Sequence, residues 1–186
     1  MDTTIKALAD EVRTQGFVVL RHHLPRQLLD DCDAAFGPLL AAKEEEIRQR
    51  PNRGPMRHYI PLPLAPPFYD KRVFDDGRLM ALLCELLGDD MMIGQFATDT
   101  PLLGSAYQSV HADMPPLFPE APTCQHPPWL ICVNYPFNDV LTPARGPFEI
   151  CRGSHLLPRD EALRRIAAGE LRLEPLLMEA GDVYAP

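Results

Sequence analysis

The residues with the clearest capacity for chemistry are a histidine and an aspartate two positions apart, His111 and Asp113. They end a stretch that begins at Tyr107, in which apolar and polar residues alternate as in a β-strand. Because residues i and i+2 of an extended chain point to the same face, the imidazole and the carboxylate can reach one point. These groups are two of the three ligands in the 2-His-1-carboxylate set that holds non-heme Fe(II). The pair therefore predicts an iron site, and no third ligand stands out in the sequence.

The bulk composition is that of one acidic globular domain. The 186 residues suffice for a single core, with 46% hydrophobic and 24% charged residues. The net charge of −8 gives no general attraction for phosphate backbones, so we expect no nucleic-acid partner. We expect no membrane partner either, because no stretch is apolar for long enough to span a bilayer and the polar N-terminus is unlike a signal peptide.

The cysteines show no paired spacing. They are Cys32, Cys84, Cys124, Cys132 and Cys151. An odd, dispersed set favours reduced thiols and a cytoplasmic protein. Cys124 and His126 invite a zinc interpretation, but no second Cys/His pair at ligand spacing accompanies them. We therefore interpret them as a free thiol and a loop histidine.

The first half of the chain has the patterning of helices. Apolar residues at helical spacing predict a first helix that ends at Gly16, and Gly88 is placed to end a leucine-rich one. A break or kink is expected at Gly37-Pro38, because proline disrupts a helix interior. Helices are expected over residues 4–15, 24–36, 43–50 and 79–87, with a short buried strand over residues 17–20 and a long loop over residues 51–67.

From residue 91 the pattern changes to strands. They are expected over residues 91–98, 107–113, 129–137, 148–151 and 171–178, with a short helix over residues 159–168. Helices first and strands afterwards predict an α+β fold with a mainly β core, an antiparallel barrel or jelly roll buttressed by N-terminal helices. We expect one domain over residues 1–186. Its final strand follows Gly181-Asp182 and ends after three residues with nothing to pair, so we expect the domain to be incomplete at its C-terminal end.

Four motifs occur in a specific order along the chain. They are Gly16-Phe17-Val18-Val19-Leu20, His111-Ala112-Asp113, the strand from Trp129 followed by Gly146-Pro147 and Gly153-Ser154-His155, and Gly181-Asp182-Val183-Tyr184. Together they resemble the phytanoyl-CoA dioxygenase family of Fe(II)/2-oxoglutarate oxygenases. His-x-Asp alone is a weak signal, and an ordinary surface pair is then the better interpretation. Gly-Pro followed by Gly-Ser-His downstream of it is considerably more specific, so we interpret His111 and Asp113 as metal ligands.

The resemblance implies a double-stranded β-helix, the cupin-like jelly roll, with Fe(II) bound by His111, Asp113 and a distal histidine. It also implies 2-oxoglutarate as co-substrate, anchored by an arginine beyond that histidine. Both of these residues are expected after Pro186. Molecular oxygen and a small organic substrate complete the implied reaction, in which 2-oxoglutarate yields succinate and CO2 while a substrate carbon is hydroxylated. Asp113 favours hydroxylation over halogenation, because related halogenases leave that position without a carboxylate so that chloride can bind.

Four polar residues are candidates for binding 2-oxoglutarate. Gln95 and Asn134 lie within predicted strands, where a polar amide needs a partner. An outward-facing or backbone-bonded amide is an equal alternative for both. Tyr107 and Gln108 directly precede the ligand pair, and either can line the pocket or serve in packing.

Three basic groups gather in the loop over residues 51–67. Arg53, Arg57 and His58 can together receive a carboxylate or phosphate of a substrate. A solvated loop is the alternative, and we favour it. His155 in the Gly-Ser-His turn is interpreted as a structural hydrogen-bonding residue.

Three functions compete on these observations. The first is a 2-oxoglutarate-dependent dioxygenase acting on a small organic molecule. The second is a non-catalytic cupin-like binding or interaction protein with an incomplete metal site. The third is a metal-dependent cupin of another reaction class, which usually recruits more histidines from the same strands than this chain supplies. The sequence does not indicate the oligomeric state.

Overall fold

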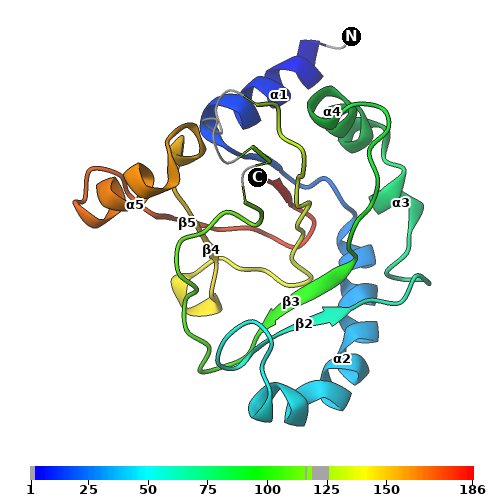
Figure 1. Ribbon diagram of the computed structural model, residues 1–186. Coiled ribbons are helices and arrows are strands. Elements are labelled where there is room, and N and C mark those ends of the chain that lie inside the picture. The colour runs from blue at the N-terminus through cyan, green and yellow to red at the C-terminus, as the bar shows by residue number, and fades with distance from the viewer. Residues whose placement is uncertain (1–2, 116, 119–125) are drawn as a thin grey trace.

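The computed structural model describes residues 3–115, 117–118 and 126–186. The longer helices run along one side of the molecule, and short strands with long connections form the other (Figure 1). In chain order the elements are α1 (Thr3–Gln15), β1 (Val18–Leu20), α2 (Arg26–Gln49), β2 (Arg57–Pro61), α3 (Lys71–Phe74), α4 (Gly77–Leu87), β3 (Ala97–Pro101), the short 3-10 turn η2 (Pro143–Arg145), β4 (Phe148–Ile150), the 3-10 turn η3 (Ser154–Leu156), α5 (Arg159–Ala167), β5 (Glu174–Leu176) and β6 (Val183–Ala185).

Local signals in the sequence fix the ends of the helices. The amide of Gly16 donates to the carbonyl of Val12 at 2.8 Å, and its positive φ of 88° ends α1. The carboxylate of Asp76 caps α4 by accepting hydrogen bonds from the amides of Arg78 and Leu79. Gly88, with φ 95°, ends that helix. Helices α1 and α4 then pack against each other through their apolar faces.

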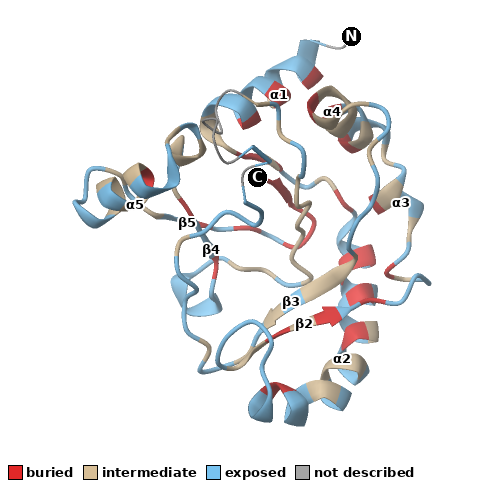
Figure 2. Ribbon diagram, viewed as in Figure 1, coloured by how far each residue is buried: buried red, intermediate tan, exposed pale blue. Residues whose placement is uncertain are grey.

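The central strands β1 and β6 separate two apolar clusters. Val18, Leu20 and Val183 belong to the main core, together with the inward faces of α1, α2 and α4. Phe17 and Tyr184 belong to a second cluster, as alternation along a strand requires. Buried residues are concentrated on the inward helix faces and along the central C-terminal strand (Figure 2).

Short antiparallel pairings organise the C-terminal part of the chain. Strand β6 pairs with β1, with Val18 opposite Ala185, and β5 pairs with β4. Isolated bridges join Asn134 to Tyr184 and Val140 to Met178. Both bridges belong to one register, because six residues separate their members on each side. The segment from 134 to 140 therefore runs alongside the segment from 178 to 184.

Several expectations from the sequence are confirmed. Helices α1 and α4 end at their glycines, β1 follows α1 directly, and α5 ends just before Gly169. Strands β4 and β5 lie within the expected ranges 148–151 and 171–178. The charged segment over residues 43–50 is helical, as the last part of α2.

Other expectations were wrong, mainly where tertiary contacts decide. Of the break or kink expected at Gly37-Pro38, the break is absent: helix α2 continues through Pro38, because apolar side chains on both sides of the proline pack against the core. The expected loop over residues 51–67 contains β2, which pairs with β3, and β3 begins six residues later than the strand expected from residue 91. The range 107–113 is irregular, and in the range 129–137 only Asn134 forms a bridge. The last strand, β6, has a partner in β1.

The described strands form three two-stranded antiparallel sheets. They make the fold a mixture of helices and small sheets, and no closed barrel is present among the described residues. The double-stranded β-helix therefore stays a prediction. None of the described helices has the length and apolar character needed to cross a bilayer. Cys32, Cys84, Cys132 and Cys151 are free thiols.

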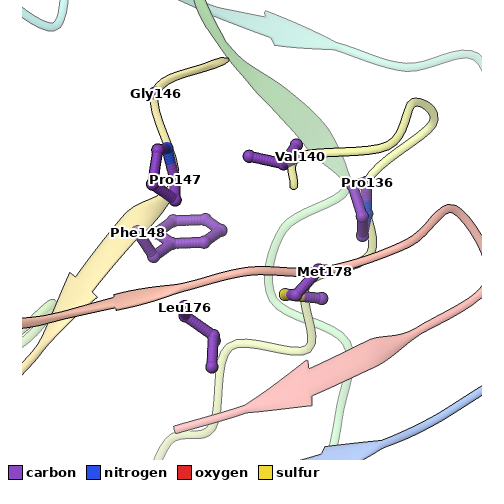
Figure 3. Close-up of a pocket in the computed structure, with 7 residues that line it drawn as sticks. All are labelled: Pro136, Val140, Gly146, Pro147, Phe148, Leu176 and Met178. Carbon is purple, nitrogen blue, oxygen red and sulfur yellow. The ribbon is translucent and has the colours of Figure 1, made fainter. Parts of the chain in front are cut away.

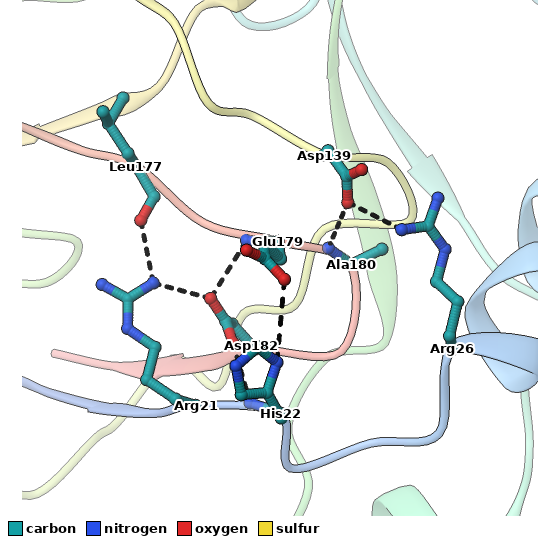
Figure 4. Close-up of polar contacts among 8 residues, drawn as sticks. All are labelled: Arg21, His22, Arg26, Asp139, Leu177, Glu179, Ala180 and Asp182. Atoms are coloured by element: carbon teal, nitrogen blue, oxygen red, sulfur yellow. Dashed lines mark hydrogen bonds and ion pairs between the residues drawn. The ribbon is translucent and has the colours of Figure 1, made fainter.

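One buried carboxylate holds the turn that leads into β6. Asp182 is 1% exposed and accepts hydrogen bonds from the amides of His22, at 2.8 Å, and Glu179, at 3.0 Å. The guanidinium of Arg21 donates to the same carboxylate at 2.6 Å and to the carbonyl of Leu177 at 2.9 Å (Figure 4). Burial raises the pKa of Asp182, but these hydrogen bonds and the charge of Arg21 outweigh burial and hold the pKa below its usual value.

We expect Gly181→Ala to destabilise the protein by about 2 kcal/mol or more. Gly181 has φ 107°, and a Cβ at this position would lie 2.7 Å from the carbonyl oxygen of Leu24. The free energy of unfolding in urea measures the effect. Gly37→Ala is the matched control, since nothing lies within 4 Å of that Cβ and alanine is the better helix former. Equal stability of the two variants would contradict the close approach at Gly181.

We expect Asp182→Asn to cost about 2 kcal/mol at neutral pH, because an amide cannot accept all the charge-assisted hydrogen bonds that the carboxylate accepts. The pKa of Asp182 is lower in the folded chain than its ordinary value of 3.8. Its stabilisation is therefore fully present above that value and is lost as pH falls through the folded pKa. Unfolding measured from pH 7 to pH 2 should show the difference between wild type and Asp182→Asn shrinking at low pH. Glu149→Gln, which removes an exposed carboxyl on β4, should follow the wild type throughout.

Candidate functional site

The imidazole of His111 is held by its own backbone. Its Nδ1 lies 2.7 Å from the carbonyl oxygen of Ser109. A carbonyl oxygen only accepts hydrogen bonds, so Nδ1 carries the proton and Nε2 of the neutral ring has a free lone pair. That Nε2 faces Oδ1 of Asp113 at 3.7 Å, and both side chains are about half exposed, at 45% and 53%. The pair thus presents a nitrogen and an oxygen donor to the same region of solvent.

The geometry of this pair suits one shared cation. Metal–nitrogen and metal–oxygen bonds to first-row ions are about 2.0–2.2 Å long, so two donors less than about 4 Å apart can bind the same ion. Metal-binding histidines usually donate their other ring N–H to a carbonyl or carboxylate, as Nδ1 does to Ser109 here. Across the ranges 3–115, 117–118 and 126–186, no third His, Cys, Asp or Glu joins the two donors in a metal-binding group. The described site therefore supplies two ligands.

Asp113 interacts with Cys132 and Tyr184, two groups from distant parts of the chain. The thiol of Cys132 hydrogen-bonds to Asp113, and burial, this bond and the charge of Asp113 raise the thiol pKa to about 12. Burial, followed by the charges of Asp113 and Cys132, raises the pKa of Tyr184 to about 12. Both groups are therefore neutral at physiological pH. The carboxylate of Asp113 is about half exposed, hydrogen-bonds to the thiol of Cys132 and lies within electrostatic reach of the Tyr184 phenol.

Gln95 is tied to the same region through Tyr59. The hydroxyl of Tyr59 donates to Oε1 of Gln95 at 3.0 Å. Burial raises the pKa of Tyr59 most, the charge of Arg53 lowers it, and the charge of Asp113 is among those that raise it. Tyr59 therefore lies within electrostatic reach of both Arg53 and Asp113, and it connects Gln95 to the candidate ligands.

The other three candidates for 2-oxoglutarate binding have different surroundings. The amide of Asn134 donates to the carbonyl of Cys132 at 2.8 Å, which matches the backbone-bonded alternative. Tyr107 is 64% exposed. Gln108 donates from Nε2 to the carbonyl of Arg53 at 3.2 Å, so it joins the ligand segment to the loop over residues 51–56. A binding role for these residues stays a prediction.

Sequence reasoning did not single out Tyr59, Cys132 or Tyr184 as neighbours of the pair. Cys132 had a usable signal, because it alternates with Asn134 along one face of an extended segment. Tyr184 follows the Gly-Asp turn, and its position opposite Asn134 depends on pairing between distant segments. Tyr59 lies on β2, within the range that was expected to be a loop.

A small apolar cavity lies beside strands β4 and β5. Its volume is about 50 Å³, and the ring of Phe148 at its edge lies 5.5 Å from the ring of Tyr184. The labelled side chains converge on it from β4, β5 and the segment over residues 136–140 (Figure 3). It is lined by Pro136, Val140, Gly146, Pro147, Phe148, Leu176 and Met178. Its apolar lining provides no groups for binding a polar molecule.

The remaining histidines in the sequence interpretation have structural surroundings. Nε2 of His155 donates to the carbonyl of Arg13 at 3.0 Å, so the predicted structural hydrogen bond is present. The ring also covers Gly16, where a Cβ would lie 2.6 Å from Nδ1. The ring of His126 packs on Phe118 with centroids 4.9 Å apart. Cys124, its partner in the discarded zinc interpretation, lies outside the described residues.

A comparison with models of known protein families finds none that matches this chain. The resemblance to phytanoyl-CoA dioxygenases therefore rests on the sequence motifs alone.

Proposed function

We propose that the protein is an Fe(II)/2-oxoglutarate-dependent dioxygenase that hydroxylates a small organic molecule. One observation carries the proposal: Nε2 of His111 and Oδ1 of Asp113 lie 3.7 Å apart, and Nδ1 of the histidine is bound to a carbonyl. They would supply two of the three ligands of the 2-His-1-carboxylate facial set, which leaves coordination positions open for oxygen and a co-substrate. The order of the motifs along the sequence is what indicates a 2-oxoglutarate-dependent reaction.

In this proposal His111 and Asp113 hold Fe(II), which supplies oxygen activation for attack on a C–H bond. The chain's own residues orient the donors. The carbonyl of Ser109 fixes the tautomer of His111, and the thiol of Cys132 hydrogen-bonds to Asp113. The resemblance also implies a distal histidine ligand and an arginine that anchors 2-oxoglutarate, and the described pair supplies neither. We also propose that the strands of the complete fold form a jelly roll. Because the described cysteines are free thiols, we propose a cytoplasmic location.

A second candidate is a non-catalytic cupin-like binding or interaction protein. The described residues favour it in one respect, since they bring only two donors to the site. Two donors leave most coordination positions of a divalent ion to water, so we expect weak binding. Activity separates the two candidates.

We expect the protein, including any residues that follow Pro186, to convert 2-oxoglutarate to succinate only when Fe(II) is present. His111→Ala and Asp113→Ala should each abolish succinate formation, because each removes one of the proposed ligands. Succinate and CO2 from labelled 2-oxoglutarate are the measurements. Asp160→Ala, which removes an exposed carboxyl from α5, is the control for charge and should keep full activity. His111→Ala and Asp160→Ala should unfold at the wild-type temperature, since both side chains are exposed. Unchanged succinate output from His111→Ala would exclude the proposal.

We expect residues 1–186 alone to bind Fe(II) weakly, because two ligands leave most coordination positions to water. Anaerobic calorimetric titration with Fe(II), or titration with Mn(II) followed by electron paramagnetic resonance, should give a gradual curve that His111→Ala abolishes. A sharp one-to-one end point would show that the described pair is not the whole site.

A further inference from the structure

Three basic groups of the β2 region have different surroundings in the fold. Arg57 donates from Nε and Nη2 to the carboxylate of Asp99 at 2.8 and 2.6 Å, so its charge is neutralised. His58 is buried, with Nε2 facing the amide of Asn52 at 3.3 Å and Glu46 at 3.8 Å. Arg53 is exposed, and within the described part of the chain it has no carboxylate partner. Of the three groups, only Arg53 has a charge that is free to meet a ligand.

The backbone around Arg53 is fixed at several points. Its amide donates to the carbonyl of Arg57 at 3.3 Å, and its carbonyl accepts the amide of Gln108 at 3.2 Å. The side chain of the preceding Asn52 accepts the amide of Tyr59 at 2.7 Å and closes the turn. Arg53 is therefore held by short-range bonds on one side and by the ligand segment on the other.

The guanidinium of Arg53 lies on an aromatic platform. Its central carbon is 4.7 Å from the centroid of the Tyr59 ring, and the hydroxyl of that ring is bound to Gln95. Stacking on a ring satisfies the face of a guanidinium and leaves its in-plane N–H groups free. Those N–H groups have the fork geometry that matches a carboxylate in two parallel hydrogen bonds. The platform thus pre-orients an anion-binding group.

This group lies at the edge of the candidate metal site. Gln108, which binds the carbonyl of Arg53, precedes His111 by three residues, or at most about 11 Å of extended chain. The charges of Arg53 and Asp113 both act on Tyr59. An organic molecule bound at His111 and Asp113 is therefore within reach of the Arg53 side chain.

We propose that Arg53 binds a carboxylate of the organic molecule held at His111 and Asp113. The inference rests on the proposed function, because it takes that pair as the place of reaction. An unpaired cation has a clear role there: the chain has a net charge of −8, which repels organic acids unless a local positive group receives them. The carboxylate belongs either to 2-oxoglutarate or to the molecule that is hydroxylated.

The test compares acids with their uncharged counterparts. The probes are 2-oxoglutarate in the presence of Mn(II), and hexanoate against hexanamide, each titrated calorimetrically into the wild type and variants. Arg53→Gln removes the charge, Arg53→Lys keeps it without the planar fork, and Tyr59→Leu removes the platform. Arg50→Gln removes an equal charge three residues away on the exposed end of α2 and is the matched control.

We expect Arg53→Gln to weaken binding of one acid about tenfold, the usual loss for a charge-assisted hydrogen bond. A loss for 2-oxoglutarate assigns Arg53 to the co-substrate. A loss for hexanoate, with hexanamide unchanged, assigns it to the substrate. Tyr59→Leu should follow Arg53→Gln, Arg53→Lys should lie between it and wild type, and Arg50→Gln should bind as wild type does. A purely structural role for Arg53 would alter hexanoate and hexanamide alike.

Unchanged affinities for both acids in Arg53→Gln would overturn the inference, and so would a wild type that binds neither acid. Titrations on His111→Ala separate this inference from the proposed function. If acid binding in His111→Ala still depends on Arg53 while no protein sample forms succinate, the anion site stands and the dioxygenase proposal fails. If succinate forms at the wild-type rate in Arg53→Gln and both acids bind normally, only the inference fails.

Discussion

The fold depends on one buried carboxylate that joins two distant parts of the chain. Asp182 binds the backbone just after β1 and the backbone just before β6, and it does so with its full charge. The two strands are only three residues long, and so short an antiparallel pair has little stability of its own. The turn around Gly181 and Asp182 therefore sets the register that places Tyr184 opposite Asn134. Because Tyr184 lies within electrostatic reach of Asp113, this register also positions one neighbour of the candidate site.

Alternate side chains of β6 belong to two different apolar clusters. Val183 and Ala185 belong to the helical core, which holds the strand in place. Tyr184 points to the opposite face, where its ring contacts Phe17 and Phe148. The charge of Asp113 contributes to the raised pKa of Tyr184. A single residue thus connects the apolar cavity, the second cluster and the candidate ligands. Asp113 therefore has a defined neighbour in Tyr184 although its own segment is irregular.

The sequence predicted features that depend on neighbours along the chain. Gly16 and Gly88 end helices because a positive φ is a local property, and His111 and Asp113 converge because two residues of separation suffice even without a regular strand. Features that depend on distant segments were missed. The range over residues 107–113 alternates like a strand but pairs with no other segment that the structure describes. Strand β2 lies in a proline-rich stretch, and its pairing with the distant β3 could not be read from the sequence. The placement of Tyr59 and Cys132 near Asp113 likewise follows from tertiary packing.

The balance of charges links the candidate ligands His111 and Asp113 to Arg53. The Cys132 thiol and the Tyr184 phenol stay neutral, with pKa values of about 12, so Asp113 supplies the negative charge on this face. Arg53 adds one positive charge nearby, which by itself opposes the binding of a divalent cation. A dicarboxylate that binds with the cation removes the conflict, because the charges of ion, ligand, Asp113 and Arg53 then sum to zero. On this argument the site favours a cation and an organic acid bound together over either one alone, as the proposed chelation of the metal by a co-substrate requires.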